Sequence, residues 1–385
     1  MVRPTIARVI RALCVIAMLV GCGGAPSGAG ETTTTARTEL PPVDPAALRE
    51  FQAGVRAMQE GGRPAMRRAR ERFEAAIAID PNLWEAHYDL GVIQRDAGEL
   101  REAAASFEAA RAIQPASGEV LAALAETRYA LGERDAAADL LRAYVAQHPE
   151  SIPVRVALAT VLRERGDHDG ALAQAREVLV RDPRNVRALA EIGRIYRARE
   201  QYDVAELVVR KAVEIQDAAD LHNDLGLIQL ARGDTQAAFE EFQRAIALDA
   251  RFAPAHLNQG AVLLRAGDYA GAATEYRAVL AADPEHLDAR VALGAALRAQ
   301  GEHAQARREY ERVLESAPNH AGATFNLAVL LADFLDERPR ARELFVRFLE
   351  IAPSGGEYRA TAQRYVDEIP APAPAAPPRA AGAAR

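Results

Sequence analysis

The chain has 385 residues, of which 49% are hydrophobic and 26% are charged, and its formal net charge is −7. This composition is typical of a folded protein and excludes wholesale disorder. The acidic balance argues against a nucleic-acid-binding protein, because such proteins usually carry a basic surplus or a basic stripe.

The first 21 residues have the organisation of a secretory signal peptide. Arg3, Arg8 and Arg11 make a positively charged start. A short apolar run from Leu13 to Val20 follows, and Gly21 stands at the cleavage position. The run is too short for a transmembrane helix, which needs about 20 apolar residues. The sequence therefore predicts a signal peptide over residues 1–21.

The signal ends in Leu19-Val20-Gly21-Cys22, which resembles the lipobox of bacterial lipoproteins. In that family the cysteine sulfur receives a diacylglyceryl group, the peptidase cuts before the cysteine, and the new amino terminus is usually acylated. The resemblance implies that Cys22 anchors the protein, since two or three acyl chains on one residue give stable attachment to a membrane. The alternative is an ordinary secretory signal in which the cysteine has no such role.

Cleavage before Cys22 has consequences for the mature chain. Cys14 is removed and Cys22 is blocked, so that no cysteine remains for a disulfide or a metal site. The loss of three arginines changes the formal net charge from −7 to −10. Gly23 follows the modified cysteine, whereas Asp at that place resembles the inner-membrane retention signal of enteric bacteria. The resemblance implies an outer-membrane lipoprotein facing the periplasm, and exposure on the cell surface stays open.

Residues 22–45 contain Gly, Ser, Pro and Thr and little that could be buried, which predicts a flexible tether. After it, residue types recur every 34 positions. Prolines with this spacing are Pro81, Pro115, Pro149 and Pro183, and then Pro284 and Pro318. Leu-Gly or similar pairs recur at Leu90-Gly91, Leu124-Ala125, Leu158-Ala159, Ile192-Gly193, Leu225-Gly226, Leu293-Gly294 and Leu327-Ala328. A fixed period of this length indicates stacked helical repeats.

Residues 84–117 resemble the tetratricopeptide repeat. The residues that carry the resemblance are Trp84, Leu90, Gly91, Ala103, Phe107, Ala110 and Pro115. The resemblance implies an all-α fold, a right-handed superhelical solenoid of about nine helix pairs. Glycines between the two helices of a pair are predicted left-handed caps: Gly98, Gly132, Gly166, Gly233, Gly267 and Gly301. Because a two-helix unit cannot bury its own apolar face, neighbouring pairs must stack.

The array is predicted to have capped ends. Residues 52–80 form an irregular first repeat, and residues 357–369 read as a polar helix that covers the last one. The predicted solenoid with its cap therefore runs over residues 46–369. Residues 370–385 are rich in Ala and Pro and are predicted to be disordered.

The resemblance also implies that partners bind to a concave face formed by the first helix of each pair. Arg187, Arg194 and Arg197 fall on one face of such a helix, and Arg163 is the equivalent of Arg197 in the preceding repeat. Guanidinium groups bind carboxylates and phosphates through paired hydrogen bonds, which suggests an acidic partner segment. The alternative is a solvated helix face whose charge is balanced by Glu164 and Glu191.

Asparagines form a second candidate site on the same face. Asn258 and Asn326, with Asn223 nearby, stand close to the Leu-Gly-type pair of their repeats. In some tetratricopeptide proteins, asparagine at this place grips the backbone of a bound peptide through its amide donor and acceptor. The alternative is that these amides face solvent or stabilise local turns.

An enzyme is not expected, because the repeats leave no room for a catalytic domain. The eight histidines are scattered without a metal-binding spacing, and each is predicted to be a surface or capping residue: His87, His148, His168, His222, His256, His286, His303 and His320. There is no Gly-rich phosphate loop and no Gly-x-Ser-x-Gly motif. No cofactor, metal or nucleic acid is expected.

The predicted function is a lipid-anchored scaffold that recruits or assembles proteins at the cell envelope. Tetratricopeptide lipoproteins of this plan resemble accessory factors of pili, secretion, motility and outer-membrane protein assembly, and the sequence does not choose among them. The alternative is a glycan-binding or peptidoglycan-binding envelope module. Aromatic stacking platforms for a sugar are scarce, with Tyr129 and Tyr196 as candidates.

Overall fold

The structure, a computed structural model, describes residues 43–352 and 357–370. Every regular element within those ranges is an α-helix, which confirms the predicted all-α class. None of these described helices is both long and apolar enough to span a membrane. The predicted signal peptide, the lipidated Cys22, the tether up to residue 42 and the tail from residue 371 lie outside the described residues.

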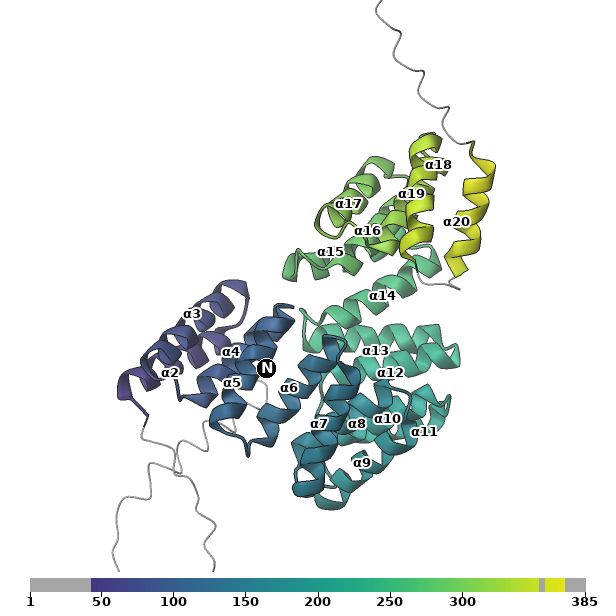
Figure 1. Cartoon of the computed structure of the whole chain (residues 1–385). Coiled ribbons are helices and arrows are strands. Elements are labelled where there is room, and N and C mark those ends of the chain that lie inside the picture. Colours follow the sequence, from purple (N-terminus) through teal and green to yellow (C-terminus); the bar gives the residue numbers. More distant parts are fainter. Residues whose placement is uncertain (1–42, 353–356, 371–385) are drawn as a thin grey trace, which may run out of the picture. The chain divides into compact units, whose positions relative to one another are not determined.

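In chain order the described helices follow one another as nine successive pairs, and one further helix comes after them (Figure 1). The number of pairs and the final helix agree with the prediction. The chain divides into two compact units, the first ending at Ile195 and the second beginning at Tyr196, and each unit is described by itself.

The helices of the first unit are α2 (Pro45–Glu60), α3 (Arg63–Ile79), α4 (Trp84–Asp96), α5 (Leu100–Ile113), α6 (Gly118–Ala130), α7 (Arg134–Gln147), α8 (Ile152–Glu164) and α9 (His168–Arg181). Helix α10 (Val186–Ala198) contains the boundary between the units. The second unit continues with α11 (Tyr202–Ile215), α12 (Ala219–Arg232), α13 (Thr235–Leu248), α14 (Ala253–Ala266), α15 (Tyr269–Ala282), α16 (Leu287–Ala299), α17 (His303–Ser316), α18 (Ala321–Asp333), α19 (Arg338–Ile351) and α20 (Glu357–Glu368).

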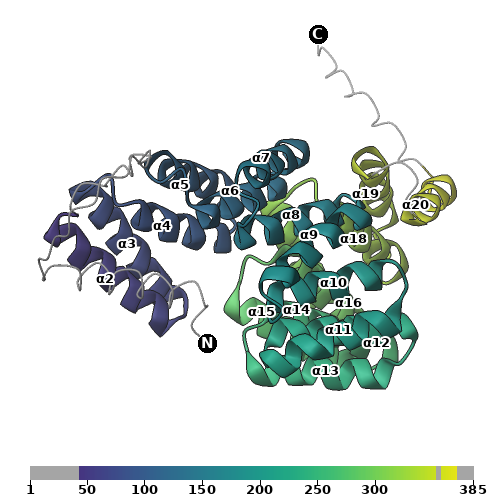
Figure 2. The same ribbon diagram turned by 90° about the horizontal axis from the view of Figure 1, so that it is seen from below.

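Even-numbered helices from α2 to α18 are the first helices of their pairs, and odd-numbered helices are the second. In the first unit α3, α5 and α7 each pack on the first helix of the next pair, as Figure 2 shows for α2 to α7. In the second unit α11, α13, α15 and α17 do the same. Stacking of this kind buries the apolar face that a single pair would leave exposed.

Glycines reverse the chain between the two helices of most pairs. The six glycines predicted as caps all have positive φ, between 80° and 89°, and the prediction is confirmed. In the pair α10/α11 the equivalent residue is Glu200, which adopts a φ of 60° although it has a side chain. A positive φ costs little for glycine and more for any residue with a Cβ atom.

A small residue stands where the two helices of a pair cross, because an aromatic ring from the second helix fills the space above it. A Cβ atom built on Gly91 would lie 2.8 Å from Phe107, and one on Gly260 would lie 2.5 Å from Tyr276. Both rings are buried. The repeating Gly and the repeating aromatic residue are therefore two halves of one packing unit, in which the ring replaces the missing side chain.

The last helix covers the end of the second unit. The rings of Phe345 in α19 and Tyr365 in α20 stack with their centroids 4.5 Å apart. The hydroxyl of Tyr365 donates a hydrogen bond of 2.7 Å to Asp333 at the end of α18, and Ala362 is buried. Helix α20 thus supplies the apolar and polar contacts that a further repeat would otherwise make.

Candidate functional site

The predicted binding residues all lie on first helices, namely α8, α10, α12, α14 and α18. We call the surface made by these helices the first-helix face of each unit. First helices of successive pairs contact one another, as α4 with α6 and α6 with α8 in the first unit, and α12 with α14 and α16 with α18 in the second. A segment bound along this face can therefore touch several repeats.

In the first unit, two of the predicted arginines converge on one buried carboxylate. Glu191, which is 3% exposed, accepts hydrogen bonds from Arg163 at 2.9 Å and from Arg194 at 2.7 Å. Arg163 also pairs with Glu164 at 2.7 Å. Arg163 and Arg194 are thus paired with carboxylates of the same chain.

The other two predicted arginines are not brought into that cluster. Arg187 lies exposed near the start of α10. Arg197 lies on the same helix within the second unit, and its Nε atom is buried without a hydrogen-bond partner among the described residues. The structure therefore joins Arg163 and Arg194, through Glu191, and leaves Arg187 and Arg197 out of that network.

A cluster of acidic residues on α4 and α6, which the sequence reasoning did not single out, surrounds Tyr88. We call Glu85, Asp89, Glu119 and Glu126 the acidic patch. Burial, together with the charges of Glu119, Asp89 and Glu126, raises the pKa of Tyr88 to about 12, and the charge of Arg95 opposes this rise. Glu85 and Asp89 are four residues apart on one helix, a spacing that places them on one face and that the sequence already displayed.

In the second unit, two of the three predicted asparagines touch each other. The Asn258 side-chain amide donates a hydrogen bond of 2.8 Å to the Asn223 side-chain oxygen, between the neighbouring first helices α14 and α12. Asn326 donates to the backbone oxygen of Gly322 at 2.8 Å, within its own helix. The Asn223–Asn258 hydrogen bond therefore links two neighbouring first helices, whereas Asn326 bonds to a backbone group of its own helix.

The first helices of the second unit also carry half-buried apolar side chains. They are Leu227, Leu230, Leu257, Leu264, Val291 and Val329. The first-helix face of the second unit is thus apolar with a few amides, and that of the first unit is charged. Apolar side chains with a few fixed polar groups are the usual lining of sites that bind peptides.

A polar contact that recurs between the helices of a pair was not predicted. The fourth residue of the first helix bonds to a residue nineteen positions later, on the second helix: His222 with Glu241, His256 with Glu275, Arg290 with Glu309, and Arg155 with Gln174. His222 and His256 are both 7% exposed. The expectation that every histidine is a surface or capping residue is therefore wrong for these two, because a carboxylate on the facing helix satisfies each ring inside the repeat.

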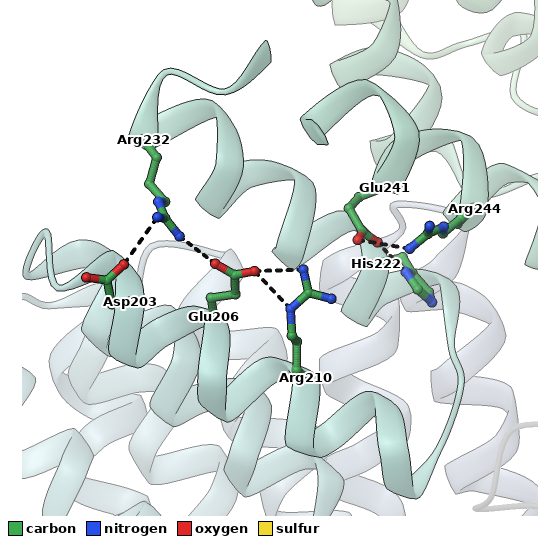
Figure 3. Close-up of polar contacts among 7 residues, drawn as sticks. All are labelled: Asp203, Glu206, Arg210, His222, Arg232, Glu241 and Arg244. Carbon is green, nitrogen blue, oxygen red and sulfur yellow. Dashed lines mark hydrogen bonds and ion pairs between the residues drawn. The ribbon is translucent and has the colours of Figure 1, made fainter. Parts of the chain in front are cut away.

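Figure 3 shows the His222 contact and a second network beside it. His222 hydrogen-bonds to Glu241 at 2.6 Å and to Asp217 at 2.8 Å, and both partners raise the pKa of the imidazole. Burial opposes ionisation of Glu241, but its contacts with His222 and Arg244 hold its pKa below the ordinary value. These groups are paired with one another, and so the network holds the two helices of the repeat together.

In the second network Glu206 of α11 accepts from Arg210 at 2.7 Å on the same helix and from Arg232 of α12 at 2.6 Å, and Arg232 also pairs with Asp203 (Figure 3). Ion pairs of this kind contribute little when they are exposed. They fix the position of α12 against α11 and need no ligand.

The described residues contain no group of three or more His, Cys, Asp or Glu side chains that could hold a metal ion. A hollow of about 450 Å³ is lined by Arg290 and Arg312, yet both arginines already pair with Glu309. The chemistry that these surfaces offer is binding through charge, amides and apolar contact.

Comparisons with known proteins agree with this geometry. Tetratricopeptide-repeat profiles match residues 66–118, 94–160, 156–220, 219–252 and 263–324. No curated protein sequence matches the chain. One similar solved structure is that of the APC/C hetero-tetramer Cut9–Hcn1. The match covers 85% of this chain and 77% of the solved chain, with 14% sequence identity and a TM-score of 0.55.

A second similar solved structure is the human IFIT1 dimer with PPP-AAAA. The match covers 70% of this chain and 73% of the solved chain, with 19% sequence identity and a TM-score of 0.51. At these identities the likeness is one of fold. The repeat profiles together cover more than half of the residues, and with the stacked helix pairs within each unit they lead to one conclusion: this chain belongs to the tetratricopeptide-repeat family.

Proposed function

We propose that this protein is a scaffold that holds segments of partner proteins against the first-helix faces of its repeats. The observation that carries the proposal is the first-helix face of the second unit, where the Asn223–Asn258 amide pair and half-buried leucines lie on the same two helices, α12 and α14. Leucine side chains supply contact area, and amides supply a donor and an acceptor for a peptide backbone.

A binding role also fits what the chain does with its charged groups. The buried carboxylates Glu191 and Glu241 each serve two cationic partners inside the protein, so they are used for structure. A catalytic centre needs groups that are free to exchange protons or attack a substrate. The described part of the chain places its buried titratable groups mainly in structural pairs.

We further propose that the scaffold works at the cell envelope, anchored by acyl chains on Cys22 and facing the periplasm from the outer membrane. This proposal rests on the signal-like residues 1–21 and the lipobox-like ending, which lie outside the described residues. Membrane fractionation with intact-mass measurement tests it. The wild type is expected to carry acyl mass and to float with outer membranes, and Cys22→Ala to be free of acyl mass and soluble. A wild type without acyl mass contradicts the anchor.

Co-purification from the native cell tests the scaffold itself. Leu264→Arg places a charge on the apolar first-helix face, whereas Leu207→Arg places the same charge on α11, a second helix, where Leu207 is 71% exposed. We expect Leu264→Arg to lose partner proteins that the wild type and Leu207→Arg retain. Equal retention by both variants contradicts the proposed binding face.

A further inference from the structure

We infer that the first-helix face of the first unit receives a lysine or arginine side chain of a partner segment at Asp89. The inference rests on the proposed scaffold function and adds the chemistry of the partner that this unit recognises. It differs from the acidic partner suggested by the arginines, because the structure finds two of those arginines already neutralised and finds an unpaired acid elsewhere.

Asp89 is a buried carboxyl without a partner. Its side chain belongs to a residue that is 8% exposed, and no described residue forms a hydrogen bond or an ion pair with it. Other buried acids of the chain are paired, as Glu191 is with Arg163 and Arg194. A buried carboxylate without a counter-charge is costly, which makes Asp89 an exception that calls for an explanation.

The surroundings of Asp89 carry more negative than positive charge. Glu85 lies one helical turn before it on α4, and burial together with the charge of Asp80 raises the pKa of Glu85. On the neighbouring helix α6, the pKa of Glu126 is raised, because burial outweighs the opposing charges of Arg95 and Arg187. Arg95 is already bound to Glu126, with 3.3 Å between their atoms.

These groups gather around one aromatic ring. Tyr88 packs its ring on Phe107 with 5.6 Å between centroids, and the charges of Glu119, Asp89 and Glu126 all act on its hydroxyl. Four carboxyls and a tyrosine on adjacent first helices make a site with hydrogen-bond acceptors and an aromatic surface. An ammonium or guanidinium group is the ligand that satisfies both features.

Burial and the charge of Glu85 raise the pKa of Asp89 to about 7. Near neutral pH the Asp89 carboxyl is therefore protonated part of the time, which lowers the free-energy cost of burying it. A bound cation would replace that proton and stabilise the carboxylate. The carboxyl thus stays compatible with folding in the absence of the partner and gains a charge-assisted hydrogen bond in its presence.

Fluorescence anisotropy with labelled peptides tests the inference on the mature chain. The probes are peptides of about ten residues with one apolar background that differ at a single central residue: lysine, norleucine or glutamate. We expect the lysine peptide to bind at least about ten-fold more tightly than the norleucine peptide, because of the added charge-assisted contact. Asp89→Asn is expected to abolish this preference, so that the lysine and norleucine peptides bind it with similar affinity.

Asp139→Asn is the matched control, because Asp139 lies on the second helix α7 and its side chain is 75% exposed. It is expected to keep the full preference for lysine. A lysine preference that survives Asp89→Asn, or no preference in the wild type, overturns the inference while the scaffold proposal stands. Failure of every probe to bind, norleucine included, counts against both the inference and the proposed function. Glu119→Gln, at the half-buried rim of the patch, is expected to weaken the preference without abolishing it.

Discussion

The Nδ1 atom of His222 lies 2.6 Å from a carboxylate oxygen of Glu241, across the two helices of one repeat. The other ring nitrogen lies 2.8 Å from Asp217, in the loop that precedes the helix. One imidazole therefore ties the first helix to the second helix and to the connection that leads into the repeat. Arg155 and Arg290 make the same pair of contacts, each with a backbone carbonyl in the preceding loop.

His222→Gln is expected to lower the free energy of unfolding by about 2 kcal/mol at pH 6, because a charged hydrogen bond in a buried place is lost. The contacts with Glu241 and Asp217 raise the pKa of His222 in the folded protein. Their stabilisation is thus complete below the ordinary histidine pKa of about 6.5 and is lost as the pH rises through the raised value.

Urea unfolding of the wild type and His222→Gln at pH 6 and pH 9 measures this difference. We expect a smaller difference at pH 9. His87→Gln is the control, since His87 occupies the same position of its repeat and bonds to the Pro81 carbonyl at 3.1 Å in place of a carboxylate. A penalty for His222→Gln that is the same at both pH values contradicts the account.

Gly91→Ala is expected to destabilise the protein by about 1–3 kcal/mol, because the new Cβ atom collides with the buried ring of Phe107. Gly322→Ala is the matched control, since its new Cβ atom would lie 3.4 Å from the nearest atom, in His320. That change places alanine in a helix and is expected to be neutral or stabilising by up to about 1 kcal/mol. Thermal unfolding compares the two. Equal effects of both substitutions count against the proposed packing unit.

The Tyr310 hydroxyl is buried without a hydrogen-bond partner among the described residues, and burial raises the pKa of this tyrosine to about 12. Tyr310→Phe is therefore expected to stabilise the protein, by about 1 kcal/mol, because it removes an unsatisfied polar group. Tyr144→Phe is expected to have the opposite sign, since the Tyr144 hydroxyl donates to the Ala116 carbonyl at 2.7 Å. Denaturant midpoints of the two variants show whether each substitution stabilises or destabilises the protein. A destabilised Tyr310→Phe would mean that the Tyr310 hydroxyl has a hydrogen-bond partner after all.

Asp89→Asn is expected to change how stability depends on pH. In the folded protein the pKa of Asp89 is about 7, above its ordinary value of 3.8. The contribution of Asp89 to the free energy of unfolding is therefore fully present below about pH 4 and is lost as the pH rises through 7. Asparagine has no such dependence. The variant should therefore be more stable than the wild type at pH 8, by on the order of a few kcal/mol, and should approach it at pH 4.

Urea midpoints of both proteins between pH 4 and pH 8 measure the change. A constant difference over that range would mean that Asp89 titrates near its ordinary pKa and that its carboxyl is better solvated than the structure indicates.

The nine helix pairs were predictable because the 34-residue period records contacts that every repeat makes within itself. Gly91 and Phe107, for example, are sixteen residues apart in the same repeat, and the same spacing returns at Gly260 and Tyr276. The left-handed caps were predictable for the same reason, since each depends on the local backbone.

Side-chain partners between repeats were harder to predict. Arg163 hydrogen-bonds to Glu191, which lies 28 residues later in the sequence. The sequence shows which helix face each residue occupies, but not which side-chain rotamers bring the two groups into contact. The sequence did not single out Asp89, because the absence of a partner for its carboxyl is visible only once every neighbour has been placed. The spacing of Glu85 and Asp89 was the one signal in the sequence for the acidic patch.

Photo-crosslinking in the native cell tests the central claim most directly, that partners bind on first helices. A benzophenone amino acid replaces Leu257, on first helix α14, in one variant and Leu207, on second helix α11, in the other. The account predicts that the Leu257 variant forms crosslinks to partner proteins and that the Leu207 variant does not. Crosslinks from Leu207 with none from Leu257 would place the partners on the opposite surface and contradict it.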